Sequence, residues 1–161
     1  MRFQVDRRRG FTLVELAIAV VILVLLMMLA VPSMNGVLAD RRLRKSLDSF
    51  NAVVREARER SVKERRPYLI VLFEGKVGLR PEGVSRGENR EPEVKWKLTR
   101  NESLKIGFPA ALVDEIPPEW IFWPSGNCEP AVVTFKGTDG SWKANYSALT
   151  AQSETVSYVA K

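Results

Sequence analysis

The stretch RRRGFTLVELAIAVVILVLLMMLAVPS, residues 7–33, decides how this chain is built. Its three arginines and one glycine are followed by residues 11–31, in which only Thr12 and Glu15 are polar. A helix of that length rises about 30 Å, which matches the hydrocarbon core of a bilayer. Because that core holds no water to satisfy backbone groups, the sequence predicts a membrane-spanning helix.

The charges beside the apolar run predict its orientation. Arg7, Arg8 and Arg9 adjoin its first residue, which favours a cytoplasmic N-terminus. A second basic cluster, beginning at Arg41, lies about ten residues beyond the other end of the run, so we expect the nearer cluster to dominate. The rest of the chain would then lie on the opposite side of the membrane.

The peptide bond between Gly10 and Phe11 is the best candidate for proteolytic processing. An ordinary secretory signal has a shorter apolar core that ends in a small-residue cleavage site, and residues 30–33 (AVPS) provide no such site. Glycine leaves the backbone accessible to a protease. A cut there would keep the apolar helix on the mature chain and create a new ammonium group at Phe11.

Glu15 is the one acidic residue in the apolar run. An ionised carboxylate costs about 2.5–3.5 kcal/mol at the centre of a membrane helix and less near the interface. In a bundle of staggered helices, the Phe11 ammonium of one chain could reach Glu15 of the next, and such a pair would fix the register of the helices. Alternatively, Glu15 lies among lipid headgroups near the arginines, and the spacing leaves both interpretations open.

The segment GFTLVEL, residues 10–16, follows a short basic leader and precedes a long apolar helix. This arrangement resembles the class III signal of type IV prepilins and type II secretion pseudopilins. The resemblance implies that a prepilin peptidase cleaves after Gly10 and methylates Phe11, that Glu15 docks the subunit into a filament, and that Pro32 bends the helix. A proline inside a helix also removes one backbone donor and clashes with the preceding turn.

The same resemblance implies a location. The chain would cross the bacterial inner membrane once, with a cytoplasmic N-terminus and a periplasmic head, and would assemble into a periplasmic filament. Lipid of the inner membrane and other pseudopilins or pilins would be its partners. A simpler alternative is a single-pass anchored protein whose head acts alone, and this alternative predicts no processing at Gly10.

An amphipathic helix is predicted after the membrane segment. Apolar residues recur at spacings of three and four at Leu43, Leu47, Phe50, Val54 and Ala57. Glu56 and Arg60 are spaced for an i,i+4 ion pair on the other face. The helix should end before Pro67, because the residue before a proline avoids the helical conformation. We therefore expect a leader at 1–10, a transmembrane helix at 11–35 and a stem helix at 36–66.

The remaining residues, 67–161, are typical of strands. Residues 68–73 and 76–80 flank Glu74-Gly75 and predict a hairpin, and the polar residues 81–92 predict a loop. Val94, Trp96 and Leu98 alternate with polar residues and predict a half-buried strand, and further strands are expected near 104–108, 120–123, 131–135, 142–146 and 155–159. The predicted fold class is α+β, with a long N-terminal helix packed against an antiparallel sheet head.

The head also resembles a subgroup. YLIVLF at 68–73, IFWPSG at 121–126 and VVTF at 132–135 are similar to segments of the H-type minor pseudopilins and FimT-like minor pilins. This implies a minor pseudopilin of the type II secretion pseudopilus, which supports export of folded proteins across the outer membrane. The alternative is a FimT-like minor pilin that serves pilus assembly or DNA uptake. Residues 150–153 (TAQS) stand where the family often has a Thr-Gly pair, so the arrangement of the last strands stays open.

The composition argues against catalysis and metal binding. The chain has no histidine, which is the commonest general base and metal ligand, and its single cysteine, Cys128, cannot form an internal disulfide. No Asp-rich segment resembles the calcium loop of the major pseudopilin, and Asp139-Gly140 is more simply a turn. We therefore predict no enzymatic activity, no metal and no cofactor.

Three further candidate sites have simpler structural interpretations. Trp120 and Trp123 flank a turn and are expected in the core rather than at a partner surface. Cys128 is expected to be a half-buried loop residue. The net charge is +6, of which the first ten residues supply half, and acidic residues interleave with Arg86, Arg90, Lys95 and Lys97. This pattern favours a mixed solvated surface over a nucleic-acid interface, which remains the alternative.

Overall fold

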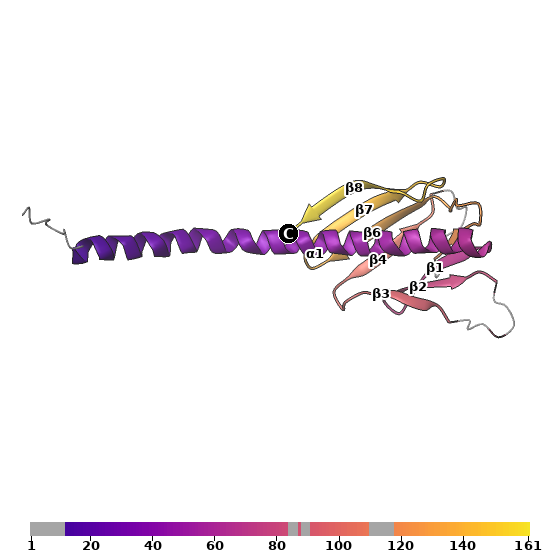
Figure 1. Ribbon diagram of the computed structural model, residues 1–161, viewed down its shortest axis with the longest axis horizontal. Coiled ribbons are helices and arrows are strands. Elements are labelled where there is room, and N and C mark those ends of the chain that lie inside the picture. Colours follow the sequence, from indigo (N-terminus) through magenta and orange to yellow (C-terminus); the bar gives the residue numbers. More distant parts are fainter. Residues whose placement is uncertain (1–11, 84–86, 88–90, 110–117) are drawn as a thin grey trace, which may run out of the picture. The chain divides into compact units, whose positions relative to one another are not determined.

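The computed structural model describes residues 12–83, 87, 91–109 and 118–161, without the side chains of residues 29–35. The chain divides into two compact units, Met1–Val37 and Leu38–Lys161. Helix α1, Leu13–Glu64, contributes residues to both units, whereas every strand of the described part belongs to the second (Figure 1). We refer to the second unit as the head.

Helix α1 ends where the sequence predicts. Its last helical residue is Glu64, and Arg65 has a left-handed backbone with φ of 53°, which is a common way for a helix to end. Pro67 follows and cannot continue the helix. The Glu64 carboxylate accepts hydrogen bonds from the Tyr68 hydroxyl at 2.7 Å and from the Arg66 guanidinium at 2.6 Å. These bonds join the helix end to the first strand.

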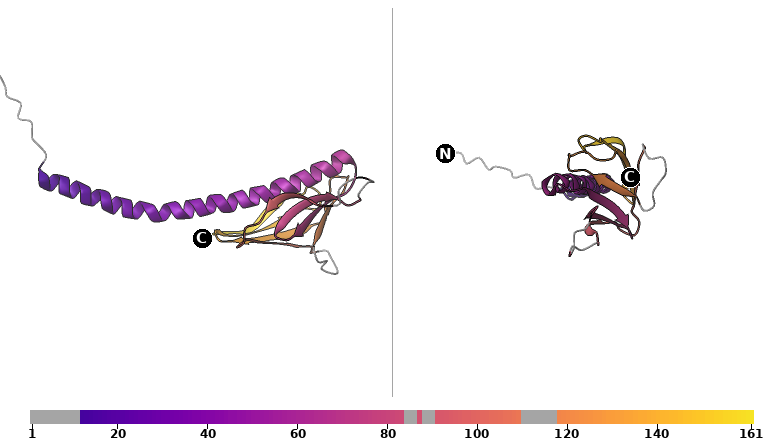
Figure 2. Two further views of the ribbon diagram at one scale, coloured as in Figure 1. Left: turned by 90° about the horizontal axis from the view of Figure 1, so that it is seen from below. Right: turned by 90° about the vertical axis from the view of Figure 1, so that its right-hand side faces the viewer.

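The head contains two four-stranded sheets, with strand orders β3-β2-β1-β5 and β4-β6-β7-β8, and each neighbouring pair of strands is antiparallel (Figures 1 and 2). The predicted α+β fold, with helix packed against antiparallel sheet, is confirmed for the head. The strands are β1 (Tyr68–Phe73), β2 (Lys76–Pro81), β3 (Glu93–Lys97), β4 (Ser103–Gly107), β5 (Glu119–Phe122), β6 (Ala131–Gly137), β7 (Gly140–Tyr146) and β8 (Ser153–Ala160).

Two of the hairpins in the head bear on the sequence predictions. The predicted hairpin of β1 and β2 is confirmed: Phe73 pairs with Lys76, and Glu74 and Gly75 both have positive φ, at 46° and 69°. Two positive φ values in a two-residue connection define the turn type that matches strand twist. The C-terminal arrangement that the sequence left open is a hairpin of β7 and β8. Ala151, between these strands, has φ of 54°, a conformation that glycine adopts more readily.

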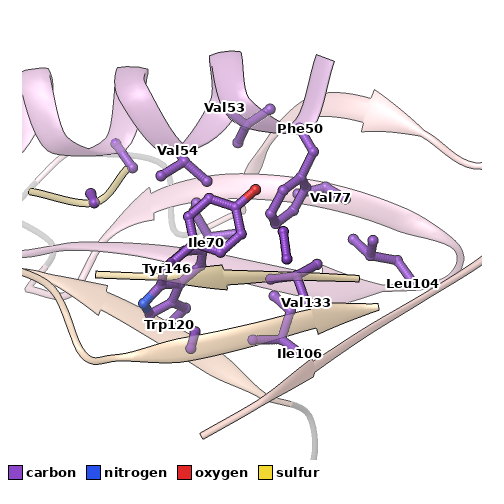
Figure 3. Close-up of a cluster of buried hydrophobic side chains, with 14 of the residues drawn as sticks. Phe50, Val53, Val54, Ile70, Val77, Leu104, Ile106, Trp120, Val133 and Tyr146 are labelled. Atoms are coloured by element: carbon purple, nitrogen blue, oxygen red, sulfur yellow. The ribbon is translucent and has the colours of Figure 1, made fainter. Parts of the chain in front are cut away.

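The core of the head forms between the two sheets and α1. The predicted stripe on α1 is confirmed: Leu43, Phe50, Val54 and Ala57 are buried and Leu47 is partly buried against them. Phe50 is fully buried, and Figure 3 shows its ring among side chains from both sheets. The centroid of its ring lies 5.9–6.4 Å from those of Trp96, Trp120, Trp142 and Tyr146.

Strand β3 carries a residue that was predicted to be buried and is exposed. Val94 was expected on the buried face of its strand, but 39% of it is accessible. Strand β3 is at the edge of its sheet, and the pairing of β2 with β3 shifts register between Val77 and Gly78. Val77 pairs with Trp96, which is packed against the core, but the next residue of β2, Gly78, pairs with Val94. Val94 therefore does not continue on the same face of the sheet as Trp96. Alternation along the strand alone does not reveal such a shift.

Hydrogen bonds and ion pairs join α1 to the last two strands. The Trp142 indole donates to the Ser46 hydroxyl at 2.9 Å, and the Tyr146 hydroxyl donates to the Asn51 side chain at 2.6 Å. The Tyr158 hydroxyl lies 2.9 Å from the Asp40 carboxylate and 3.0 Å from the Asp40 carbonyl oxygen. In the turn before β7, both carboxylate oxygens of Asp139 accept hydrogen bonds from Arg42, at 2.8 and 3.0 Å.

Gly140 allows the start of β7 to lie very close to α1 and β8. A Cβ atom placed on Gly140 would lie 2.1 Å from the Val159 carbonyl oxygen and 2.9 Å from Leu43. The predicted turn at Asp139-Gly140 therefore packs directly against both α1 and β8.

Candidate processing and assembly site

The predicted processing residues, Gly10 and Phe11, lie outside the described residues. The predicted cleavage after Gly10 and methylation of Phe11 therefore stay predictions. The first described residue is Thr12, which lies immediately before α1.

Thr12 caps the N-terminus of α1. Its hydroxyl accepts a hydrogen bond from the Glu15 backbone N–H at 3.3 Å, and its carbonyl accepts one from the Leu16 N–H at 3.2 Å. The first N–H groups of a helix have no partner within the helix, and a threonine at this position satisfies one of them. We did not predict this role, although Thr-x-x-Glu is a recognisable capping pattern. Thr12 therefore fixes where the helix begins relative to Glu15.

Glu15 lies in the first turn of α1 and is exposed. The N-terminus of a helix carries partial positive charge, which favours a carboxylate there. Among the described residues, none forms an ion pair with Glu15. Its side chain is therefore available to a group outside the described residues or on another molecule.

The side chains that surround Glu15 are apolar and exposed. Leu13, Val14 and Leu16 are 85%, 65% and 62% accessible, and the large apolar residues as far as Met28 are also exposed. A contiguous exposed apolar surface of this kind is typical of a site that contacts another protein or a membrane. In the part of the chain that the structure describes, no helix is both long enough and apolar enough to cross a membrane.

Pro32 lies within α1, among the residues whose side chains are not described. The bend predicted there stays a prediction.

The two candidate tryptophans have different environments. Trp120 is fully buried, and its indole donates to the Glu129 carbonyl at 2.6 Å, so its predicted core position is confirmed. Trp123 is 37% exposed, so the same prediction was wrong for this residue. The reason is that Trp123 begins the turn after β5, where the Ser61 hydroxyl donates to its carbonyl at 3.1 Å.

Cys128 is more buried than predicted. Only 2% of it is accessible, and its backbone pairs with Phe122. Burial raises the pKa of the Cys128 thiol to about 11, because the charged thiolate is poorly solvated there. A thiol with this environment is a packing residue rather than a reactive one.

We expect Cys128 to resist alkylation in the folded protein. At pH 8 a thiol with a pKa of about 11 is about one part in a thousand thiolate, and the thiolate is the reactive form. Iodoacetamide labelling followed by mass analysis should show little modification in buffer and rapid modification in urea. Rapid labelling of the folded chain at pH 8 would contradict the buried position.

The proposed basic patch on the head is only partly described. Arg86 and Arg90 lie outside the described residues. Lys95 is paired with Glu56 and Glu93, each at 2.6 Å, and Glu56 also forms the predicted pair with Arg60 at 2.6 Å. Lys97 is exposed. The described part therefore has the mixed, ion-paired surface that the sequence favoured.

Comparison with known families identifies the N-terminal segment. Residues 6–31 match the family model of the prokaryotic N-terminal methylation motif. The match includes Gly10, Phe11 and Glu15, so the motif on which the sequence prediction rests is present. No curated protein is significantly similar to the chain.

Comparison with solved structures identifies the fold of the remainder. Two structures of the minor pseudopilin EpsH from the type 2 secretion system of Vibrio cholerae align with TM-scores of 0.50 and 0.51 and identities of 13% and 11%. They cover 71% and 73% of this chain and 95% and 97% of theirs. The type IV minor pilin FimU of Pseudomonas aeruginosa aligns with a TM-score of 0.50 and 19% identity, over 73% of this chain and 90% of its own.

These similarities bear on different parts of the chain. The identities are low, so the structural matches show a shared fold, and the family model concerns the N-terminal segment alone. The matched N-terminal motif and the shared fold together confirm that this chain resembles the type IV pilin and pseudopilin family.

Proposed function

We propose that this protein is a minor pseudopilin, a structural subunit of a type II secretion pseudopilus that supports export of folded proteins. The observation that carries the proposal is the methylation motif at residues 6–31, followed by an exposed apolar helix surface and a separate β-rich head. An exposed apolar helix is costly in water and stable in lipid or in a helical bundle. A filament subunit needs both environments in turn, first the membrane and then the bundle.

In this proposal the subunit is anchored in the inner membrane by residues 11–35. The arginines of the leader hold the N-terminus in the cytoplasm, and the head lies in the periplasm. A prepilin peptidase removes residues 1–10 and methylates the amine of Phe11. The mature chain would then begin one residue before Thr12, which caps α1.

Assembly depends on Glu15. The carboxylate projects from the first turn of α1 among apolar side chains, where it is costly without a partner. The Phe11 ammonium of a neighbouring subunit supplies the opposite charge. Such a pair selects one axial register over others, because a displaced subunit would leave both charges unpaired in an apolar bundle.

The head then lies at the periphery of the filament. Its core residues on α1 are occupied by the two sheets, so the buried face of the stem is unavailable to other subunits. The work of the protein is mechanical: filament growth, driven by an ATPase elsewhere, pushes substrates toward an outer-membrane channel. No catalytic group of the head is required for this role.

A minor pilin of a type IV pilus is the second candidate. The similarity of the fold to the minor pilin FimU favours it as much as the similarity to EpsH favours the first. Deleting the gene in its host separates the two. Loss of secreted folded proteins with normal surface pili supports the pseudopilin, and loss of pili with normal secretion supports the pilin.

The first experiment is intact-mass and N-terminal analysis of the protein purified from its own membranes. We expect a chain that begins at N-methylated Phe11. A chain that begins at Met1 would identify an ordinary membrane anchor, and the function would then have to lie in the head alone. A Gly10→Val variant is the control, because a larger residue at the cleavage position should leave the full-length chain.

A further inference from the structure

The outer face of the sheet β4-β6-β7-β8 carries a row of lysines. Alternate residues of β4, β6 and β7 are buried against the core, as Ile106, Val133 and Trp142 illustrate (Figure 3 shows the first two). The residues between them point to the opposite face, because side chains alternate along a strand. Lys105, Lys136 and Lys143 are among these outward residues, and all three are exposed.

The strand register places these lysines close together. Lys105 pairs with Thr134, and Thr134 pairs with Lys143, so the three residues form one line across the sheet. Neighbouring strands lie about 4.8 Å apart, which puts the two lysine Cα atoms about 10 Å from each other. Lys136 is two residues along β6 from Thr134, about 7 Å away on the same face.

The charges on the β4, β6 and β7 part of this face are all positive. Elsewhere in the described head some basic residues are ion-paired, as Arg42 is with Asp139 and Arg80 with Glu119, whereas others such as Lys45 and Lys97 are exposed without an ion pair. In the described residues, no carboxylate pairs with Lys105, Lys136 or Lys143. The other outward positions of β4, β6 and β7 include no acidic residue: Ser103, Gly107, Val132, Thr134, Ser141 and Asn145. The acidic residue on this face is Glu154 of the edge strand β8, which pairs with Asn145.

We propose that this lysine face is a docking surface for an acidic protein that lies outside the filament. The inference rests on the proposed function, which places the stem helix in the filament interior. Helix α1 packs on the opposite, buried face of the sheet, so the lysines face away from the stem. A second copy of this chain is disfavoured as the occupant, because two such faces would bring like charges together.

The residue types favour carboxylates over phosphates. All three cations are lysines, whereas arginine is the residue whose guanidinium group forms bidentate hydrogen bonds with phosphate. None of the outward positions on β4, β6 and β7 is aromatic, and Phe108, which lines the hollow beside them, is partly buried against the core, so these strands provide no exposed ring on which bases could stack. Hydroxyl groups of Ser and Thr lie between the lysines and could donate to carboxylates as well.

A hollow beside the lysines also restricts the shape of the surface that could bind there. It has a volume of about 690 Å³, and Lys105 and Lys143 line it together with the apolar residues Leu72 and Val132. A protein surface can place an apolar side chain there while its carboxylates meet the ammonium groups. A nucleic-acid backbone has no equivalent apolar projection. The geometry therefore fits an acidic protein surface with a protruding apolar residue.

The test compares two triple variants of the full-length chain in non-ionic detergent. The first is Lys105→Gln, Lys136→Gln and Lys143→Gln, and the second is the charge-matched control Lys45→Gln, Lys63→Gln and Lys97→Gln. The probe is a labelled 20-residue polyglutamate peptide. We expect the first variant to bind about tenfold more weakly than wild type or worse, and the control to lose less than about threefold, because charge contacts are local under physiological salt.

Equal losses in the two variants would overturn the proposal, since the effect would then reflect net charge alone. A second probe, a 20-base-pair DNA duplex, tests the other class of polyanion. Tighter binding of the duplex than of polyglutamate, lost in the first variant, would assign the face to nucleic acid and also overturn it. These measurements use the purified chain, so they do not depend on filament formation.

Carbodiimide cross-linking in the host then locates the partner, because this reagent joins a lysine amine directly to a carboxylate. Support requires cross-links from these three lysines to an acidic residue of a protein that is not a filament subunit. Cross-links only to other subunits would overturn the outer location. If the wild-type chain never enters a filament, the proposed function fails, which is a separate result from the binding comparison.

Discussion

Replacing Phe50 by alanine is expected to destabilise the head by about 3–5 kcal/mol, the usual cost of removing a large buried aromatic side chain. Phe50 is fully buried, and its ring lies within 6.4 Å of four other aromatic rings, measured between centroids. Those rings belong to both sheets, so the cavity left by the substitution would open where the two sheets and α1 meet. A typical domain has a total stability of only about 5–15 kcal/mol.

Urea unfolding of the full-length chain in detergent measures this effect. All four tryptophans lie in the head, so their fluorescence reports on the head and not on the N-terminal unit. Leu149→Ala is the matched control, because Leu149 is 76% exposed and should change stability by less than about 0.5 kcal/mol. Similar midpoints for Phe50→Ala and the control would show that Phe50 is not at the centre of the core.

The second large effect is expected at Glu15. In the proposed filament, Glu15→Ala leaves the neighbouring Phe11 ammonium unpaired in an apolar bundle, and removing one partner of a buried ion pair costs about 3–5 kcal/mol. Because 1.4 kcal/mol is already tenfold in an equilibrium, we expect incorporation into filaments to fall by more than about tenfold. Membrane insertion and cleavage after Gly10 should be unchanged.

Two controls make this result specific. The fraction of subunit that sediments with sheared filaments is measured alongside the mass of the mature chain, which reports on processing. Asp48→Ala removes one exposed carboxylate from the head-packed part of α1 and should assemble normally. Normal incorporation of Glu15→Ala would refute the ion-pair role and leave Glu15 as an interfacial residue.

Features encoded within a few residues could be predicted. The stripe from Leu43 to Ala57 follows from helical spacing, the end of α1 follows from Pro67, and the first hairpin follows from Glu74-Gly75. Each depends on backbone preferences that act locally. The same holds for the motif at residues 10–16, which is read directly from the sequence.

Features that depend on long-range pairing could not be predicted. The division into two sheets arises because β4 pairs with β6, rather than with β3, which precedes it. The exposure of Val94 follows from a register shift in its pairing with β2. The lysine face combines residues of three strands, and nothing in the separation of Lys105 from Lys136 and Lys143 along the chain indicates that they share one surface.

The candidate assembly site could be predicted only in part. The sequence identified Glu15, but the partner expected for it belongs to another chain, so no description of one chain can bring the two together. Thr12 is the residue that sequence reasoning missed, although its spacing from Glu15 was sufficient to suggest it.

The bond between Tyr158 and Asp40 has a consequence for biosynthesis. It joins the beginning of the head to its end, across 118 residues of chain, and β8 completes its sheet only when these last residues are present. Contacts between such distant residues form slowly, and a chain still emerging from the ribosome or the translocation channel cannot make them. Until β8 has been synthesised, the edge of β7 stays open to any other unpaired strand. Nascent subunits are therefore at greatest risk of aggregation or proteolysis before β8 has emerged, and a chaperone that shields β7 would protect them at that stage.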